Sequence, residues 1–362
     1  MKAQNILVGT SKGLAVVGQA AEGWQINTIH FSGMPVNMVY ADPISGAWWI
    51  SLAHHHWGTK LHRSPDQGTT WESIPVPTYP AGTVVRDGKA AKLKKIWCLA
   101  QGGPEHPDRF WLGTEPGGLF VTNDQGKHFE LVSGLWDHPS RSNPMQWFGT
   151  GRNEAFIHSI LVDPRNSDHV YVAVSCAGVF ESWDAGKSWE AKNRGLKAAY
   201  LPNPAAEVGH DPHMMHACKL TPDVLWQQNH CGIFRSVNGG QEWMDVSGPD
   251  QFPHYGFALA IDEEDPLKAW VIPAESDEVR QPRDLALQVH MTKDGGQHWQ
   301  ALTNGLPQEH CFDLVFRHAF AFQKPFMVFG TTNGNLFLSD DEGMNWQHHS
   351  AHLARISAVC FG

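Results

Sequence analysis

The sequence predicts an all-β fold, a seven-bladed β-propeller whose blades are four-stranded antiparallel sheets. One eight-residue sequence recurs six times along the 362 residues, and its copies start 58, 60, 54, 56 and 47 residues apart, a period typical of solenoids and propellers. A short alternating run precedes the copies, and a β-rich run precedes that, as expected of a small antiparallel sheet. The copies are Ser64–Trp71, Thr122–Phe129, Ser182–Trp189, Ser236–Trp243, Thr292–Trp299 and Ser339–Trp346.

The residue types of this repeat predict a hairpin turn with a hydrophobic anchor. In the cleanest copy, the hydroxyl of Ser182 and the carboxylate of Asp184 can hydrogen-bond to nearby backbone amides. Gly186 supplies a positive φ at low steric cost, and Trp189 ends the unit with a large apolar surface. We therefore expect the repeats to stabilise turns and to have no chemical role.

The repeat resembles the Asp box, also called the bacterial neuraminidase repeat (BNR), and the whole chain resembles the glycosyl-hydrolase-like propellers of the sialidase-like superfamily. This resemblance implies a single propeller domain over residues 1–362. It also implies that the boxes lie at the periphery of the blades, on the side away from the ligand site. The first strand of each blade would then line the central channel.

The two ends of the chain are expected to share one blade. Residues 5–10, 13–17 and 24–30 resemble the last three strands of a repeat, with a degenerate turn at 19–23. Residues 354–361 have the composition of a strand but no hairpin partner of their own. Pairing of this C-terminal strand with residues 5–10 would give seven complete blades and close the ring, which protects the sheet edges.

Composition and charge indicate a soluble globular protein without a membrane or nucleic-acid partner. No stretch approaches the roughly 20 apolar residues of a membrane helix, and a formal charge of −10 argues against nucleic-acid binding. The start lacks the apolar core of a signal peptide, and the six cysteines form no Cys-x-x-Cys pair. We therefore expect reduced thiols and a cytoplasmic location, whereas the oligomeric state stays open.

The candidate ligand-binding residues lie in the connections into first strands, in the loops between second and third strands, and at the channel mouth. The resemblance implies that ligands meet this face of a propeller. The sequence contains 22 histidines, which the repeats do not explain. The candidates are His54, His138, Arg141, His158, His213, His216 and His230. Arg141 and Arg152, in one long connection, could hold an anionic substrate.

Two of these histidines occupy the same place in successive blades by sequence count. Counting back six residues from Pro164 gives His158, and the same count from Pro222 gives His216. Neutral imidazoles are common transition-metal ligands, so His158, His216 and His230 form a candidate metal site at the channel mouth, although their spacing fits no sequential metal motif. No cofactor is certain from the sequence, and a divalent metal is the one candidate.

Carboxylates on the same loops are candidates for cleaving a glycosidic bond, which commonly needs one acid and one base or nucleophile. Loop position favours Glu115, Glu207, Asp211 and Glu275, but no pair stands out. A true sialidase is disfavoured, because the resemblance would require an Arg-Ile-Pro element near the start, three converging arginines and a tyrosine paired with glutamate. The first eighty residues hold one arginine, Arg63, and the element Arg355-Ile356-Ser357 lies at the other end without the proline.

The leading hypothesis is a glycosyl-hydrolase-like propeller that binds a small polar or carbohydrate ligand on its loop-rich face, with hydrolysis of that ligand left open. The first alternative is a non-catalytic binding or assembly propeller, similar to the photosystem assembly factors built from such repeats. The second alternative is a metal-dependent enzyme that uses the histidine cluster. Enrichment of the loops in histidine, tryptophan and carboxylates favours a small-molecule site over a flat protein-binding face.

Overall fold

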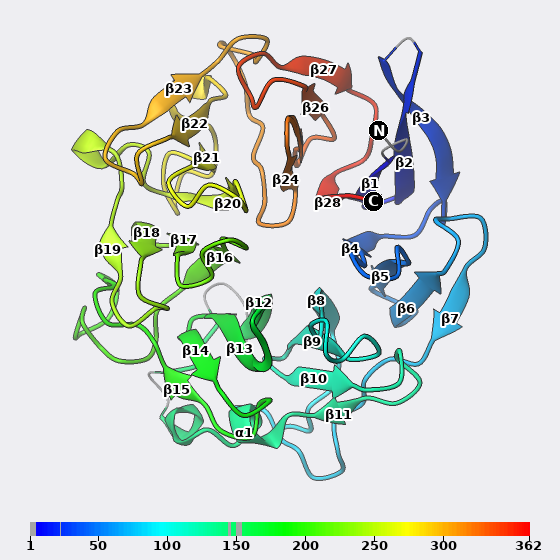
Figure 1. Cartoon of the computed structure of the whole chain (residues 1–362), viewed down its shortest axis with the longest axis vertical. Coiled ribbons are helices and arrows are strands. Elements are labelled where there is room, and N and C mark those ends of the chain that lie inside the picture. Colours follow the sequence, from blue (N-terminus) through cyan, green and yellow to red (C-terminus); the bar gives the residue numbers. More distant parts are fainter. Residues whose placement is uncertain (1–4, 22, 144–145, 150–153) are drawn as a thin grey trace.

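The computed structural model describes residues 5–362 apart from 22, 144–145 and 150–153. Seven four-stranded antiparallel sheets stand around a central axis, which confirms the predicted seven-bladed propeller (Figure 1). From the axis outward, blade one contains β28 (Ile356–Phe361), β1 (Asn5–Thr10), β2 (Gly13–Ala20) and β3 (Gly23–His30). Blade two contains β4 (Val36–Ala41), β5 (Trp48–His54), β6 (Gly58–Ser64) and β7 (Glu72–Ile74).

The remaining blades follow the chain in order around the ring. Blade three contains β8 (Lys95–Gln101), β9 (Phe110–Glu115), β10 (Leu119–Thr122) and β11 (Glu130–Leu131). Blade four contains β12 (Phe156–Asp163), β13 (Asn166–Ser175), β14 (Gly178–Ser182) and β15 (Glu190–Ala191). Blade five contains β16 (Pro212–Ala217), β17 (Leu225–Asn229), β18 (Gly232–Ser236) and β19 (Met244–Asp245). Blade six contains β20 (Gly256–Ile261), β21 (Ala269–Pro273), β22 (Val289–Thr292) and β23 (Gln300–Leu302). Blade seven contains β24 (Phe320–Gln323), β25 (Phe326–Gly330), β26 (Leu336–Ser339) and β27 (Gln347–Ser350).

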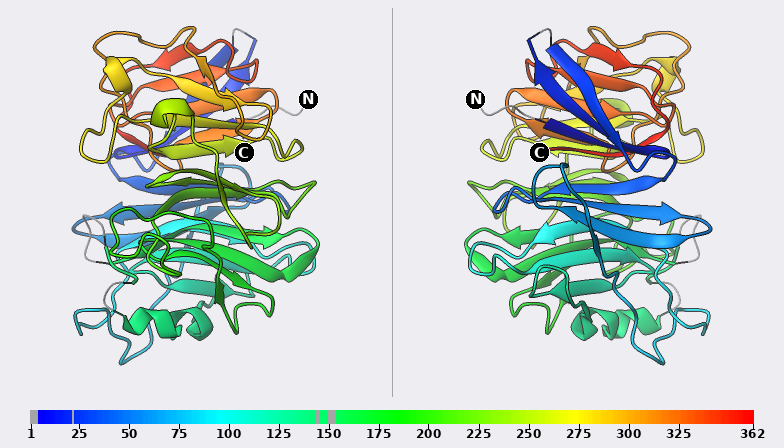
Figure 2. Two further views of the ribbon diagram at one scale, coloured as in Figure 1. Left: turned by 90° about the vertical axis from the view of Figure 1, so that its left-hand side faces the viewer. Right: turned by 90° about the vertical axis from the view of Figure 1, so that its right-hand side faces the viewer.

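Blade one joins the two ends of the described chain, as the sequence predicted. Strand β28 pairs antiparallel with β1, from Ile6 opposite Phe361 to Thr10 opposite Ile356. Figure 2 shows the red β28 beside the dark blue strands of the N-terminal hairpin. The innermost strand of this blade therefore comes from the opposite end of the sequence to its three partners.

The six repeats form the turns between the third and fourth strands. In the copy between β14 and β15, Gly186 N donates to Ser182 Oγ (2.8 Å), and Ser188 N donates to Asp184 Oδ1 (2.9 Å). The bond from the glycine amide to the first hydroxyl recurs in all six copies, at 2.7 to 3.0 Å. Gly186 has φ +84°, and a Cβ there would press on Val132 and Trp111 of blade three. Gly186 therefore serves both the turn and the contact with the preceding blade.

The hydrophobic core lies between adjacent blades. One cluster combines Trp111 and Leu119 of blade three with Ile157, Val172 and Phe180 of blade four. These residues are almost completely buried, since both faces of each blade are covered by its neighbours.

Short helices occur only in connections among the residues described. They are α1 (Ser133–Trp136), η1 (Pro139–Ser142), η2 (Pro249–Gln251) and η3 (Arg283–Leu285), where η marks a 3-10 helix. In the described part of the chain, no helix has the length and apolar character needed to cross a bilayer. The six cysteines are unpaired thiols.

Candidate functional site

The innermost strands of six blades each carry a β-bulge near their first residue. The extra, unpaired residues are Ser357 in blade one, Asn37, Trp97, His158, His213 and Phe257 in blades two to six. A bulge places two residues opposite one and so redirects a side chain away from the regular alternation. Five of the six redirected side chains line a single cavity on the axis, and His158 lines a second one.

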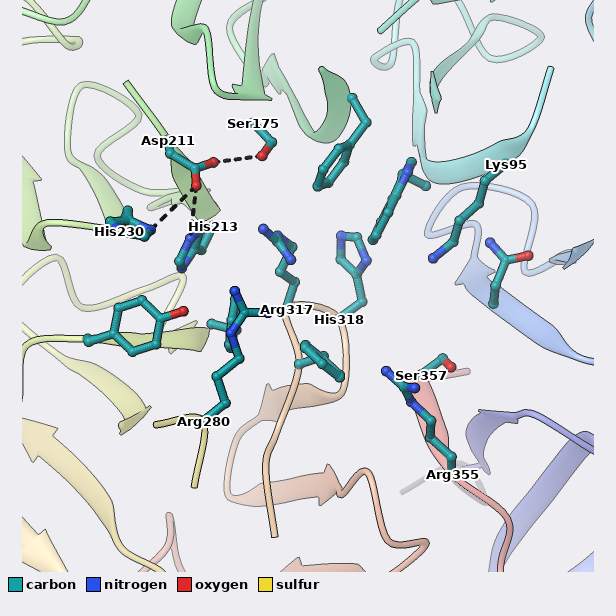
Figure 3. A pocket seen from close by; sticks show the side chains of 16 residues that line it. Lys95, Ser175, Asp211, His213, His230, Arg280, Arg317, His318, Arg355 and Ser357 are labelled. Atoms are coloured by element: carbon teal, nitrogen blue, oxygen red, sulfur yellow. Dashed lines mark hydrogen bonds and ion pairs between the residues drawn. The ribbon is translucent and has the colours of Figure 1, made fainter. Parts of the chain in front are cut away.

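The first cavity, which we call the central pocket, has a volume of about 520 Å³. Its walls combine aromatic rings with charged heads: Trp97, Phe156, Tyr255, Phe257 and Phe316 beside Lys95, Asp211, His213, His230, Arg280, Arg317, His318 and Arg355. Most of these residues stand at the starts of first strands or in the connections between second and third strands (Figure 3). The repeats follow the ends of third strands, so they lie toward the opposite face of the ring, as expected.

Four cationic side chains reach the central pocket, and each lies over an aromatic ring. Lys95 Nζ is 3.4 Å from the ring centroid of Trp97. The guanidinium carbons of Arg280, Arg317 and Arg355 lie 5.7, 5.1 and 5.0 Å from the rings of Phe257, Phe156 and Phe316, respectively. These distances suit cation–π contacts, which orient the charged heads.

Asp211 is the carboxylate of the described pocket lining, and two imidazoles face it. Its Oδ2 lies 3.4 Å from His213 Nε2 and 3.6 Å from His230 Nδ1. Its Oδ1 accepts hydrogen bonds from Ser175 Oγ (2.6 Å) and Cys176 N (3.2 Å). Burial raises the pKa of Asp211, but the charges of His213 and Arg317 and the bond from Ser175 outweigh it, so this pKa lies well below its usual range. Burial lowers the pKa of His213, although Asp211 opposes this shift.

A bridge across the channel separates the central pocket from the second cavity of about 350 Å³. His318, in the segment before β24, donates from Nε2 to the carbonyl oxygen of His158 on β12 (2.8 Å). His318 and Trp97 line both cavities. Burial is the main cause that lowers the pKa of His318 to about 4, so we expect a neutral imidazole here.

The structure places His158 and His216 apart from His230, and this corrects the composition of the candidate metal site. His158 Nε2 donates to the carbonyl of Pro212 (2.8 Å), and His216 Nε2 donates to that of Leu259 (3.1 Å). Both therefore satisfy carbonyls on the inner strand of the next blade and line the second cavity. Among the described residues, the group with three convergent metal-ligating side chains is Asp211, His213 and His230.

The bulges also correct the equivalence of His158 with His216. Pairing on either side of the bulges shows that His213 occupies the place of His158 in blade five. The connection after β16 spans seven residues, from Cys218 to Val224, whereas β12 and β13 are separated by Pro164 and Arg165 alone. Counting six residues back from Pro222 therefore stopped at His216, three residues short of the equivalent position His213.

The other candidates from the sequence lie outside the central pocket. Glu115 is buried behind its wall, where Oε2 accepts a hydrogen bond from Trp97 Nε1 (3.3 Å). Glu207 is exposed, Glu275 lies 3.9 Å from Arg283, and His54 is the last residue of β5. His138 and Arg141 line a separate surface cavity, where Arg141 lies between Trp136 and Trp147, and Arg152 is outside the described residues.

Sequence reasoning missed Lys95, Arg317, His318 and Arg355 as pocket residues. The count of arginines against a sialidase covered the first eighty residues, whereas the pocket is lined by Arg280, Arg317 and Arg355 from later in the chain. The closed blade one offered a signal, since it brings Arg355 to the start of an inner strand. Arg317 and His318 precede a strand without a bulge and carried no repeat signal.

No protein-family model matches the chain. The chain is 26% identical over 265 residues to the oligoxyloglucan-reducing end-specific xyloglucanase of Emericella nidulans. The matched region covers 66% of this chain and 30% of that enzyme. The GH74 enzyme of Niastella koreensis superposes on 95% of the chain and 52% of its own length, with a TM-score of 0.61 at 14% identity. YCF48 bound to a D1 peptide superposes on 87% of the chain and 81% of its own length, with a TM-score of 0.52 at 14% identity.

These similarities support a propeller of glycosidase-like fold. The chain spans less than a third of the length of the curated relatives it matches. The structural matches are below 25% identity and therefore bear on the fold alone. The resemblance to the bacterial neuraminidase repeat proteins stays a prediction.

Proposed function

We propose that this protein is a glycosidase-like propeller that binds a small acidic carbohydrate, through its carboxylate, in the central pocket. The carbohydrate class is supported by the sequence similarity to a xyloglucanase. The negative charge of the ligand is supported by the pocket itself, whose lining carries four cationic side chains and one carboxylate.

The observation that carries the proposal is the convergence of four cations in an acidic protein. The chain has a formal charge of −10, yet the pocket lining holds Lys95 and three arginines against the single carboxylate Asp211. Guanidinium groups match the geometry of carboxylates by paired hydrogen bonds, and an enclosed site strengthens that attraction. Among the residues described, neither Arg280 nor Arg355 forms an ion pair with a carboxylate.

The aromatic walls suit the remainder of a sugar. Trp97 and Phe156 stack at a centroid distance of 4.2 Å with an interplanar angle of 19°. Phe257 and Phe316 lie at 5.2 Å on the adjoining wall. Small-ligand sites commonly combine such apolar walls with a few polar groups that fix orientation. The apolar faces of a pyranose ring can pack on these walls while its carboxylate meets the arginines.

Hydrolysis by an ordinary pair of carboxylates has less support than binding. Asp211 is the only carboxylate in the lining of the central pocket among the described residues, and Glu115 lies behind Trp97. Tyr255 adds a buried hydroxyl beside both imidazoles, and burial raises its pKa to about 12. The catalytic roles of Glu115, Glu207 and Asp211 therefore stay predictions, and binding is the function to test first.

The test is a binding panel measured by calorimetry. Glucuronate, galacturonate and N-acetylneuraminate represent acidic sugars, and glucose, galactose and a xyloglucan oligosaccharide represent neutral ones. We expect an acidic sugar to bind, and Arg355→Gln or Arg280→Gln to weaken it by about 10- to 100-fold through loss of a charge-assisted contact. The matched control is Arg194→Gln, an exposed arginine outside the pocket.

Equal binding of neutral and acidic sugars, or unchanged affinity in both pocket variants, would contradict the proposal. Glycoside derivatives of whichever acid binds then show whether the protein also hydrolyses it. Binding of a peptide in place of any sugar would favour the alternative of a binding or assembly propeller. The cytoplasmic location and the absence of a nucleic-acid or membrane partner stay predictions from the sequence.

A further inference from the structure

We propose that Asp211, His213 and His230 bind one divalent transition-metal ion, with open coordination positions facing the central pocket. The three ligand atoms are Asp211 Oδ2, His213 Nε2 and His230 Nδ1, and they lie within 4.8 Å of one another. Figure 3 shows the three side chains gathered on one wall, opposite Lys95 and Arg355. This inference goes beyond the proposed carbohydrate binding and does not depend on it.

The spacing of the ligand atoms fits an ion placed between them. Metal–ligand bonds of about 2.1 Å in a tetrahedral site separate neighbouring ligand atoms by about 3.4 Å. The carboxylate oxygen of Asp211 is 3.4 Å from the nitrogen of His213 and 3.6 Å from that of His230. Both distances are long for direct hydrogen bonds, yet they match two edges of a coordination polyhedron.

The second nitrogen of each imidazole already faces an acceptor, as is usual for metal-binding histidines. His213 Nδ1 lies 2.6 Å from the carbonyl oxygen of Gly256, which can only accept, so Nδ1 carries the proton and Nε2 is left for a metal. His230 Nε2 lies 3.3 Å from Asp277 Oδ2 on the connection between β21 and β22. Both rings are therefore oriented with one nitrogen toward Asp211.

The carboxylate is held in the same way. Ser175 Oγ and Cys176 N both donate to Asp211 Oδ1, at 2.6 and 3.2 Å, and leave Oδ2 toward the imidazoles. Asp211 is 3% exposed and His213 2% exposed, so packing as well as hydrogen bonding fixes them before any ligand binds.

Aromatic neighbours fix the two rings further. Phe257 stacks on His213 at 4.7 Å and 21°, and Tyr255 meets the edges of His213 and His230 at 5.6 and 5.5 Å. The local charge is mixed: Asp211 and Asp277 favour a cation, whereas Arg317 opposes it.

Two imidazoles and one carboxylate suit zinc or ferrous iron. Three protein ligands leave at least one position for water or for an oxygen of the pocket ligand. A metal there lowers the pKa of bound water and polarises a bound oxygen. The order of the ligands explains why no sequential motif was visible, since Asp211 precedes β16, His213 is its bulge residue and His230 follows β17.

The decisive experiment is a zinc titration of the chelator-stripped full chain against a fluorescent competitor, with cobalt absorption as a probe of coordination. The exposed run His54-His55-His56 could bind metal adventitiously, so all variants carry His54→Ala, His55→Ala and His56→Ala as the background. We expect this background to bind one zinc ion and to give the cobalt spectrum of a site of low coordination number. His230→Ala or Asp211→Asn should weaken binding by about 100-fold or more, and Asp277→Asn by about 10- to 100-fold.

His128→Ala is the matched control, because His128 Nδ1 also faces a carboxylate, Asp124 Oδ2 at 2.6 Å, but belongs to an exposed repeat. Circular dichroism and thermal melting identify any variant that fails to fold, and Asp211→Asn keeps the shape of the side chain. A background protein that binds no metal, or folded His230→Ala and Asp211→Asn variants with unchanged affinity, would overturn the proposal. The three side chains would then form a polar network without metal. Because sugar is absent from these titrations, failure of the metal site is distinguishable from failure of the proposed carbohydrate binding.

Discussion

The six repeat turns lie at the rim of the ring, between the third and fourth strands, and each places a hydroxyl, an aspartate or asparagine and a glycine in the same geometry. The six bulges lie at the axis, on the innermost strands. They share a backbone geometry but carry five residue types. In every repeat, the glycine amide donates to the hydroxyl four residues earlier. At the bulges stand Ser357, Asn37, Trp97, His158, His213 and Phe257.

The comparison indicates that the repeat turns stabilise the ring, whereas the bulges supply the side chains of the central pocket. A repeat turn needs the same backbone bonds in each blade, so its residues are interchangeable between blades. A bulge only redirects a side chain, so its residue is free to differ and to supply whichever group the pocket needs. His213 and His158 illustrate this: the same position supplies a candidate metal ligand in blade five and a bond to the neighbouring carbonyl in blade four.

The largest loss of stability is expected from removal of β28, because this strand both closes the ring and brings residues to the pocket. Deletion of residues 354–361 removes β28, exposes an edge of β1 and takes Arg355 and Ser357 from the pocket. We expect aggregation or loss of cooperative unfolding, measured by light scattering and thermal melting. The double variant Arg355→Gln/Ser357→Ala keeps the strand and should stay folded. A soluble truncated protein that melts like the full chain would contradict the closure.

A rim anchor should affect stability alone. Trp189 is 7% exposed, and its Nε1 donates to Gly186 O (3.0 Å), so Trp189→Ala should lower the free energy of unfolding by about 3–5 kcal/mol. Ligand affinity of the folded fraction should not change. Trp183→Ala in the same repeat is the control, since Trp183 is 60% exposed and should cost far less in urea unfolding. A folded Trp189→Ala protein with weakened ligand binding would contradict the placement of this repeat on the face opposite the ligand site.

A charged network in blade four, outside the lining of the central pocket, should make the free energy of unfolding depend on pH. Asp163 Oδ2 lies 2.7 Å from Arg165 Nη2, and His169 bridges Asp163 and Glu181 at 2.8 and 2.9 Å. Burial raises the pKa of both carboxyl groups, but hydrogen bonds from Arg165 to Asp163 and from His169 to Glu181 outweigh it and lower each pKa to about 2.

These depressed values favour the folded state at every pH above the unfolded pKa, and the stabilisation is lost as the pH falls toward 2. We expect the stability difference between wild type and Asp163→Asn, measured by urea unfolding, to shrink from pH 6 to pH 2. Glu130→Gln, at an exposed carboxylate of β11, should show no such trend. A difference that is constant over this range would exclude the charged network as a source of stability.

The smallest stability change is expected at the axis. Ser357 is half-buried at its bulge, so Ser357→Ala should change the free energy of unfolding by no more than about 0.5 kcal/mol. Its effect should fall on ligand affinity, because the hydroxyl lines the central pocket. Ser73→Ala, on the exposed strand β7, is the control and should alter neither quantity. Ser357→Ala with wild-type affinity would show that this bulge is only structural.

The rim could be predicted in detail because its physical requirements repeat. Hydroxyl, aspartate, glycine and tryptophan recur at fixed spacing, and each has a local reason to be there. Closure by residues 354–361 followed from an unpaired strand pattern, and the β28–β1 pairing confirms it.

The axis could be predicted only in part. Loop position brought Asp211, His213 and His230 into the candidate set, but their convergence depends on a bulge and on a bond to Gly256 in the next blade. Lys95 was not among the candidates from the sequence, and its place over Trp97 is a tertiary contact. Neither the convergence of the three side chains nor the position of Lys95 has a local sequence signal, so the pocket could be recognised only in the assembled ring.

The bridge from His318 to the carbonyl of His158 crosses the channel where the central pocket meets the second cavity. We expect this bridge to close the channel, so that a ligand entering from the loop face leaves by the same opening. On that expectation, a long polysaccharide would not pass through the ring, and the arginines would be reached by a free molecule or by the terminus of a chain. Ligand exchange at this opening would then be sequential, because one ligand has to dissociate before the next one binds.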